Sequence, residues 1–377
     1  MPSAKQLIPI AIVLIIVVVG FSLLTKGVEE EGLQDEGPSP PEAPQDEGDE
    51  SEEPEDFERE GVTPLDDPQE PARGFYMGTL PVPYEGQGFE EAYAAVSDAG
   101  EIVPVWGRPS PYYELAEELG GSWGETFVEG MIRGNGLAPL VHMSFIDAGL
   151  NLKVPPGLEG ATLSDTEWRE GYVSAALDVV NASRPRFLSV GNEVNRWYEK
   201  YGTGTEDGFE HFVSLYEEVY DAVKEVSPET MVFCTFAREV VSENREADMS
   251  VLELFDPERM DMLVFTTYPY SLAGVNRPGD IPDDYYAEAS GYMPGKPLGF
   301  SEVAWSSLEA FGGEEGQAEL LWDIVGRLTL DIGVDLKLVM WSWLTDLSPE
   351  DTTGLICRDG TPKAAYEAWT TIASWGE

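Results

Sequence analysis

From residue 73 onward, short apolar runs alternate with longer stretches in which apolar residues recur at helical spacing. Eight of the runs have the length of a strand: "GFYMGTL", "EIVPVWG", "LAPLVHMSF", "RFLSVGNE", "TMVFCTF", "DMLVFTTY", "PLGFSE" and "LKLVMWSW". Five stretches predict amphipathic helices: "GFEEAYAAVSDAG", "SDTEWREGYVSAALDVV", "DGFEHFVSLYEEVYDAVKEV", "GQAELLWDIVGRLTLDIG" and "PKAAYEAWTTIASW". Eight strands that alternate with helices predict an α/β fold, a single (β/α)8 TIM barrel over residues 73–377.

A doubly wound open sheet is the alternative architecture. That fold normally has fewer strands and a glycine-rich phosphate-binding turn directly after a strand. The nearest candidate turn, "GTGTEDG" from Gly202, has the wrong spacing and follows no strand directly. The pattern therefore favours the barrel. Ser164 and Glu167 further predict a capping box at the start of the helix before the fourth strand.

Ahead of the barrel, residues 7–24 form an uncharged apolar run of 18 residues, about the minimum length that crosses a ~30 Å hydrocarbon core. Gly20 and Ser22 match a signal-peptidase site poorly, so an uncleaved transmembrane segment is favoured over a cleaved signal. We expect residues 1–27 to be a single-pass anchor in the cell membrane with the barrel outside, or a signal segment of a secreted protein.

Residues 28–72 contain 19 acidic residues together with many Pro and Gly and no hydrophobic period. Such a segment cannot bury enough apolar surface to offset the entropy of ordering, so we expect a disordered acidic linker.

The whole chain has a formal charge of -49. This charge disfavours nucleic acid and anionic membrane surfaces as partners and favours neutral substrates. Adaptation to high salt and simple solubility both explain such a surface, and both stay open. We expect the barrel to be monomeric.

Cysteine and histidine are scarce, with two of each. No disulfide framework is expected, and neither a zinc site nor a Ser-His-Asp triad can be assembled economically. Loop carboxylates leave a calcium site open, but we predict no required cofactor and no metal site.

Two glutamates end strand-like runs, Glu193 in "FLSVGNEVN" and Glu302 in "PLGFSEVAW". Barrel enzymes draw their catalytic groups from the carboxyl ends of the strands, so both side chains are expected at one pocket. Two carboxyl groups on opposite sides of a glycosidic bond are the essential chemistry for its cleavage. Singly, each glutamate could equally cap the following helix.

Polar and aromatic residues accompany the two glutamates. Asn192 precedes Glu193, Tyr268 ends the sixth strand, and Trp341 and Trp343 lie two apart on the eighth strand, which predicts that they share one face. A pyranose ring presents C–H groups to aromatic planes and hydroxyls to amides and carboxylates. These residues therefore suit a sugar-binding site.

The strings "SVGNEVN", "TTYPY", "GFSEVAW", "MWSW" and "TTGLICRDGTPKAAYEAW" resemble the retaining glycoside hydrolases of clan A. The motifs are nearest to the family 53 endo-galactanases and are similar also to family 17 glucanases. The resemblance implies that Glu193 is the acid/base and Glu302 the nucleophile. It also implies that Asn192 binds the sugar 2-hydroxyl, Tyr268 orients Glu302, and one strand-eight tryptophan, Trp343 in preference, lines the floor of the subsite.

Arg108 and His142 match less specific positions of the clan and are weaker candidates for binding substrate. Pairing with acidic neighbours is the alternative for Arg108, and a satisfied core or wall residue is the alternative for His142. For retention we expect the two carboxyl groups to be about 5–5.5 Å apart. Glu193 should have a raised pKa, whereas hydrogen bonds from Tyr268 and Arg108 should keep Glu302 ionised.

Two rival functions use the same residues. A surface-anchored carbohydrate-binding or scaffold barrel that has lost catalysis would also display the tryptophans. A transglycosylase would transfer the sugar to another sugar in place of water. Two glutamates with an adjacent amide and phenol favour catalysis over binding alone, because a binding module needs neither a proton donor nor a nucleophile.

Overall fold

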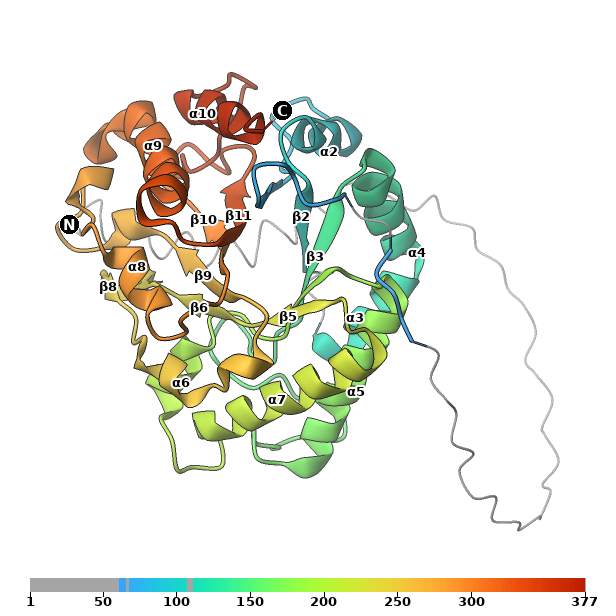
Figure 1. The fold of residues 1–377 in the computed structure, drawn as a ribbon. Helices are drawn as coiled ribbons and strands as arrows, with labels where there is room; N and C mark the ends of the chain where they lie inside the picture. Colours follow the sequence, from blue (N-terminus) through green and yellow to red (C-terminus); the bar gives the residue numbers. More distant parts are fainter. Residues whose placement is uncertain (1–60, 66–67, 107–110, 377) are drawn as a thin grey trace, which may run out of the picture.

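The computed structural model describes residues 61–65, 68–106 and 111–376. Their centre is a ring of parallel strands surrounded by helices (Figure 1). The strands of the ring are β1 (Tyr76–Leu80), β2 (Ile102–Val105), β3 (Ala138–His142), β4 (Phe187–Ser189), β5 (Met231–Phe233), β6 (Thr235–Ala237), β9 (Leu263–Thr267), β10 (Leu298–Val303) and β11 (Leu336–Trp343). All eight predicted strand runs are strands.

The ring has nine named strands but eight positions, because β5 and β6 are one strand interrupted at Cys234. β5 pairs with β4, and β6 pairs with β9. Every pairing in the ring is parallel, with the order β5-β4-β3-β2-β1-β11-β10-β9-β6. The barrel therefore closes through the broken fifth strand, and the open-sheet alternative is wrong.

The helices around the barrel include all five that the periodicity predicts. The α-helices are α2 (Phe89–Ser97), α3 (Tyr112–Gly120), α4 (Ser122–Gly124), α5 (Thr166–Ser183), α6 (Asn195–Tyr201), α7 (Phe209–Val226), α8 (Tyr285–Ser290), α9 (Gly313–Trp322) and α10 (Ala364–Ala373). Two helices, η1 (Glu125–Ile132) and η9 (Asp323–Ile332), have π geometry, so the helix expected over 316–333 changes geometry after Trp322.

Short elements fill the connections. A two-stranded antiparallel hairpin, β7 (Glu239–Val240) and β8 (Arg245–Glu246), follows β6. The 3-10 turns are η2 (Arg133–Asn135), η3 (Val241–Glu243), η4 (Ser250–Leu254), η5 (Pro257–Arg259), η6 (Pro269–Ser271), η7 (Pro278–Asp280) and η8 (Glu309–Phe311).

The predicted capping box at the start of α5 is wrong by one residue. The cap is Asp165, whose carboxylate accepts hydrogen bonds from the amides of Glu167 (3.0 Å) and Trp168 (3.2 Å). Glu167 is then the second helical residue and cannot act as the partner of a box. A carboxylate also interacts favourably with the positive end of the helix, which a serine hydroxyl does not.

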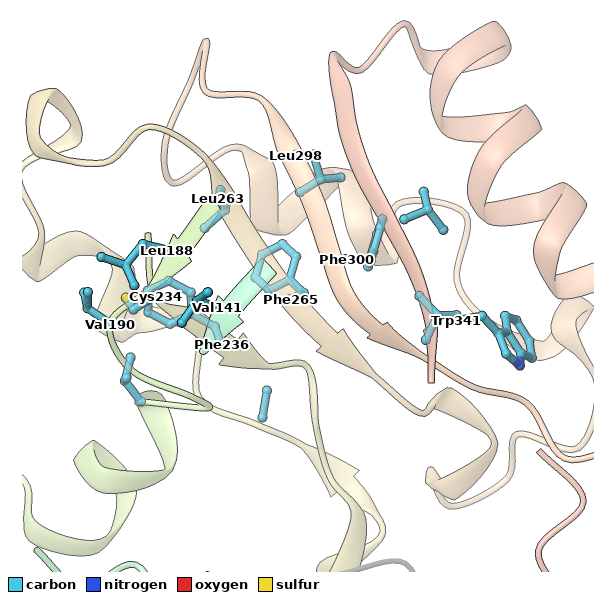
Figure 2. Close-up of a cluster of buried hydrophobic side chains, with 14 of the residues drawn as sticks. Val141, Leu188, Val190, Cys234, Phe236, Leu263, Phe265, Leu298, Phe300 and Trp341 are labelled. Atoms are coloured by element: carbon cyan, nitrogen blue, oxygen red, sulfur yellow. The ribbon is translucent and has the colours of Figure 1, made fainter. Parts of the chain in front are cut away.

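The apolar core has two layers, because strand residues alternate between the inside and the outside of the barrel. Ten buried residues form the inner cluster: Tyr76, Ile102, Ala138, Leu140, Phe187, Phe233, Met262, Val264, Leu338 and Met340. The larger cluster lies between strands and helices. Figure 2 shows part of it, with Leu263, Phe265 and Phe300 on neighbouring strands.

Part of the expected linker belongs to the folded body. The amide of Val62 donates to the carbonyl of Val226 (2.6 Å), and the Arg184 guanidinium donates to the carbonyl of Thr63 (2.8 Å). Val226 and Arg184 end α7 and α5, just before strands begin, so this segment crosses the amino ends of the strands. The ordered body therefore begins before residue 73, where the linker was expected to end.

The expected anchor, residues 1–27, and most of the linker lie outside the described residues. Within the described part of the chain, no helix has the length and apolarity that a membrane crossing requires. Both cysteines, Cys234 and Cys357, are free.

Candidate active site

Glu193 follows β4 in a left-handed backbone conformation, with φ of +49°. Thr235 on β6 supports this turn: its hydroxyl accepts a hydrogen bond from the Glu193 amide (2.9 Å) and donates one to Asn192 Oδ1 (2.6 Å). The buried Asn195 side chain fixes the next turn through the amide and carbonyl of Ala237, at 2.8 and 2.9 Å. A non-glycine residue at positive φ is strained, and these bonds hold it there.

The Glu193 carboxyl group turns towards β9, where the Thr266 hydroxyl donates to Oε1 at 2.8 Å. Burial raises the pKa of Glu193, while the Thr266 hydrogen bond and the charge of Arg196 act in the opposite direction. The direction agrees with the expectation for a proton donor. Burial is the leading cause of the shift.

Glu302 reaches the inside of the barrel because β10 contains a bulge. Leu298 and Phe300 belong to the outer layer, so simple alternation would direct residue 302 outwards as well. The pairing with β9 shifts between Phe300 and Glu302, which leaves Ser301 as an extra residue and places Glu302 opposite Thr266. A bulge of this kind re-aims a side chain, here towards the carboxyl end of the barrel interior.

Tyr268 contacts Glu302 directly, as expected from the sequence: its hydroxyl donates to Glu302 Oε2. The Ser342 hydroxyl lies 3.4 Å from the same phenol oxygen. Nevertheless, burial, followed by the charge of Glu193, raises the pKa of Glu302 to about 7, against the effect of the Tyr268 hydrogen bond. The expectation that Glu302 is held fully ionised is therefore not met among the described residues, and Arg108 lies outside them.

Thr266 connects the two carboxyl groups. It is the ladder partner of Glu302 and the hydrogen-bond donor to Glu193. The two glutamates also interact through their charges. The charge of Glu193 contributes to the raised pKa of Glu302, and neighbouring carboxyl groups that interact in this way titrate as a pair. One protonated and one ionised carboxyl group form an acid and a nucleophile in the same pocket.

The two tryptophans of the eighth strand face opposite sides, which corrects the expectation of a shared face. A second bulge is the reason: Thr79 pairs with Trp341 but Leu80 pairs with Trp343, so Ser342 is an extra residue. Trp341 is fully buried in the outer layer (Figure 2). Its indole N–H donates to the carbonyl of Thr353 at 2.8 Å. Trp341 is a packing residue, whereas Trp343, partly exposed, stays a candidate for sugar binding.

His142 ends β3 and stacks on Trp106, with ring centroids 3.8 Å apart and planes at 4°. Burial lowers the pKa of His142 to about 3, so the ring is neutral. Neither ring nitrogen has a hydrogen-bond partner among the described residues. Buried polar nitrogens are ordinarily paired, and both the substrate-binding role of His142 and its alternative as a core or wall residue stay predictions.

The late motif "TTGLICRDGTPKAAYEAW" forms the connection after β11, and Lys363 holds it together. Its buried ammonium group donates to Asp346 Oδ1 (2.6 Å) and to the carbonyls of Thr352 (3.0 Å) and Gly354 (2.9 Å). All three donors of the lysine are thereby used. The connection that follows Trp343 is thus fixed by a buried ion pair, and the motif has a structural role.

Three supporting residues had no assigned role in the sequence: Thr235, Thr266 and Ser342. Thr266 lies inside the quoted string "TTYPY", but threonine is common in strands, so its pattern carries no distinguishing signal. For the described residues, no group of three or more His, Cys, Asp and Glu side chains is arranged to hold a metal ion.

Comparison with known proteins gives a likeness of fold. No protein-family model matches this sequence, and no curated protein matches it. Among solved structures, native xylanase 10B from Thermotoga maritima superposes with a TM-score of 0.58 at 14% identity, over 80% of this chain and 95% of that chain. A family 39 glycoside hydrolase from the gut symbiont Bacteroides cellulosilyticus WH2 gives 0.54 at 18% identity, over 82% and 66%.

A GH5_18 protein from Bifidobacterium longum subsp. infantis gives a TM-score of 0.55 at 15% identity, over 79% of this chain and 78% of that chain. This chain therefore shares the barrel fold of these solved glycoside hydrolase structures. At these identities the likeness establishes the barrel, and function must come from the site.

Proposed function

We propose that this chain is a retaining glycoside hydrolase that cleaves β-linked neutral poly- or oligosaccharides, with Glu193 as acid/base and Glu302 as nucleophile. The observation that carries the proposal is the arrangement around Thr266. One glutamate accepts its hydroxyl and the other lies beside it in the sheet. The Tyr268 hydroxyl donates to Glu302, which lowers the Glu302 pKa against the larger effect of burial, and the choice of Glu302 as nucleophile follows the resemblance of the motifs.

The reaction has two displacements. In the first, the Glu302 carboxylate attacks the anomeric carbon while the bond to the leaving oxygen breaks, and Glu193 gives its proton to that oxygen. In the second, Glu193 takes a proton from water, whose oxygen attacks the anomeric carbon and releases Glu302. Two inversions retain the configuration. This course requires the carboxyl groups to be about 5–5.5 Å apart.

Several features support a neutral β-linked substrate. The charge of -49 disfavours polyanionic glycans, and the half-buried Trp343 and Trp106 suit a pyranose face. The structural neighbours include a xylanase and a GH5_18 protein from Streptomyces cattleya in complex with Manβ1-4GlcNAc. Kinship with family 53 or family 17 rests on the short motifs alone, so β-1,4-galactan and β-glucans belong in the same test panel.

The inactive binding barrel is the competing proposal. That proposal does not explain three features that are energetically unfavourable. They are the strained backbone of Glu193, the bulge that turns Glu302 inwards, and the partial burial of both carboxyl groups. Sugar binding alone does not require them. Transglycosylation differs only in the acceptor, and product analysis separates it from hydrolysis.

For the location of the protein, we propose a cell-membrane anchor within residues 1–27, with a monomeric barrel on the outside. The support is the apolar run of residues 7–24 and the acidic, Pro-rich composition of the segment that follows. Fractionation of cells that express the full chain, with and without protease outside, tests this placement.

The test of function is release of reducing ends by the full chain from β-1,4-mannan, xylan, β-1,4-galactan and β-glucans, at low and high salt. We expect cleavage of at least one glycan, retention at the anomeric carbon, and loss of activity in Glu193→Gln and in Glu302→Gln. Glu253→Gln, on an exposed glutamate, is the matched control. Normal activity in Glu302→Gln would refute the assignment, and binding without cleavage would favour the inactive barrel.

A further inference from the structure

Glu239, the first residue of the β7–β8 hairpin, has a buried carboxyl group that faces protein donors. Its Oε2 accepts the backbone amide of Tyr268 at 2.7 Å. Its Oε1 accepts the hydroxyls of Tyr285 (2.8 Å) and Thr267 (2.9 Å). One carboxyl group therefore holds two consecutive residues at the end of β9, just where the chain leaves the sheet.

The surroundings of Glu239 are built to keep it in place. The Arg238 guanidinium lies 4.0 Å from the centre of the Tyr285 ring and donates to the Tyr285 carbonyl at 2.8 Å. The Tyr286 hydroxyl bonds with the Thr267 hydroxyl at 3.0 Å. Burying a carboxyl group is costly unless it is fully hydrogen-bonded, so this cluster compensates a cost that an apolar residue would avoid.

The link from Glu239 to the candidate site passes through Tyr268. The Tyr268 amide belongs to the turn from β9 into η6, and its phenol donates to Glu302. Because amide and ring are parts of one residue, the acceptor of the amide fixes where the phenol oxygen lies. We propose that Glu239 is a positioning residue, which holds Tyr268 so that its hydroxyl stays on Glu302.

This inference rests on the proposed function only in naming Glu302 as the nucleophile. The dependence of the Tyr268 to Glu302 hydrogen bond on Glu239 is a property of the folded protein and can be measured without a substrate.

Substitutions at Glu239 distinguish the effect of its hydrogen bonds from the effect of its charge. In Glu239→Gln the amide oxygen can still accept from Tyr268 N–H, and the amide nitrogen can donate to the two hydroxyls, which reverse their direction. Glu239→Ala removes the acceptor altogether. Tyr268→Phe removes the phenol donor from Glu302 and leaves the Glu239 carboxyl group intact.

The readout is the titration of Glu302, followed by NMR of the full chain carrying 13C-labelled glutamate side-chain carboxyls. Burial raises the pKa of Glu239 and of Glu302 to about 7, so the signals of these two carboxyl groups are expected to move near neutral pH. Loss of a signal in Glu302→Gln assigns that residue. The charged or titratable groups that act on Glu302 are Glu193 and Tyr268.

The titratable or charged groups around Glu239 are Arg238, Tyr268, Tyr270, Tyr285 and Tyr286. If Glu239 acts by holding the Tyr268 amide, removing its charge while keeping an acceptor for that amide should leave the titration of Glu302 unchanged. The Gln variant tests this point.

We expect the titration midpoint of Glu302 to rise by about one unit in Tyr268→Phe, since a hydrogen bond to the ionised form is lost. Glu239→Ala should raise it similarly, Glu239→Gln should leave it near the wild-type value, and the double variant should rise no further than Tyr268→Phe. An unchanged midpoint in Glu239→Ala, or additive shifts in the double variant, would overturn the proposal.

If Glu239→Ala does not fold, Glu239→Asp carries the same expectation, because its shorter side chain cannot reach Tyr268 and Tyr285 together. With a glycan that the enzyme cleaves, the acid limb of the kcat/KM profile against pH should move to higher pH in Glu239→Ala, Glu239→Asp and Tyr268→Phe. Loss of folded protein lowers kcat/KM at every pH and cannot produce this shift. If no glycan is cleaved but the NMR shifts occur, the hydrolase proposal fails and the positioning role stands.

Discussion

At the scale of single residues, two threonines place the candidate catalytic groups. Thr235 binds both the Glu193 amide and the Asn192 side chain, and Thr266 binds the Glu193 carboxyl group. A hydroxyl serves here because it donates and accepts at once, which a valine of the same shape cannot do. The sequence predicted the glutamates, yet the residues that aim them are ordinary strand residues without a distinguishing signal.

Replacing Thr235 by Val should release the strained turn at Glu193. We expect a loss of about 1–2 kcal/mol in the free energy of unfolding, since two hydrogen bonds disappear. We also expect kcat/KM to fall by roughly 10- to 100-fold, because small displacements of catalytic groups are costly. Urea unfolding and steady-state kinetics measure these losses. Thr371→Val, at an exposed position of α10, should change neither quantity, and unimpaired kinetics in Thr235→Val would contradict the role.

The raised pKa values predict how stability depends on pH. The pKa values of Glu302 and Glu239 lie at about 7, above the ordinary value of 4.5. The folded protein thus binds these protons more tightly than the unfolded chain does, so their stabilising contribution is complete below pH 4.5 and is lost as pH rises through 7.

Urea unfolding across that pH range should show this loss, and Glu302→Gln should reduce it. Glu253→Gln should retain the wild-type dependence, because Glu253 is exposed. A Glu302→Gln variant with the full wild-type slope would mean that Glu302 does not titrate there.

At the scale of elements, hydrophobic periodicity predicted every strand of the barrel and the long helices, because burial on one or both faces determines these patterns. It could not predict the bulges at Ser301 and Ser342. A bulge leaves the composition of a strand unchanged and alters only its pairing with a neighbour, which single-sequence patterns do not contain. The assignment of Trp341 to the site failed for that reason.

The connection after β11 should depend on the buried Lys363–Asp346 pair. Lys363→Met removes a buried cation and leaves Asp346 without its partner, which should cost about 3–5 kcal/mol of unfolding free energy. Lys337→Met, which breaks the more exposed pair with Glu70, should cost about 0–1 kcal/mol. Urea unfolding measures both, and equal losses would show that burial does not distinguish the two pairs.

At the scale of the whole molecule, charge is the dominant property. The 71 Asp and Glu residues outnumber the 22 Lys and Arg residues. The carboxylates therefore repel one another, which destabilises the compact state. Salt shortens the range of that repulsion, from a Debye length of about 10 Å at 0.1 M to about 3 Å at 1 M. Adaptation to high salt and plain solubility both remain consistent with such a surface.

We therefore expect the thermal midpoint to rise as potassium chloride is increased from 0.1 to about 1 M. Chloride is chosen because sulfate would stabilise any protein through exclusion from its surface. Sucrose at equal osmolality is the control, since it is also excluded but does not screen charge. If the thermal midpoint does not change with the chloride concentration, repulsion between surface carboxylates is not the main effect of this charge on stability.

The segment around Val62 lies across the amino ends of the strands, whereas Glu193 and Glu302 lie at the carboxyl ends. The segment around Val62 thus meets the barrel at the end opposite the two glutamates. In a barrel tethered through its N-terminus, the tether would join the end opposite the candidate site, and the site would face away from that end. Long glycan chains could then approach without passing the support that holds the protein.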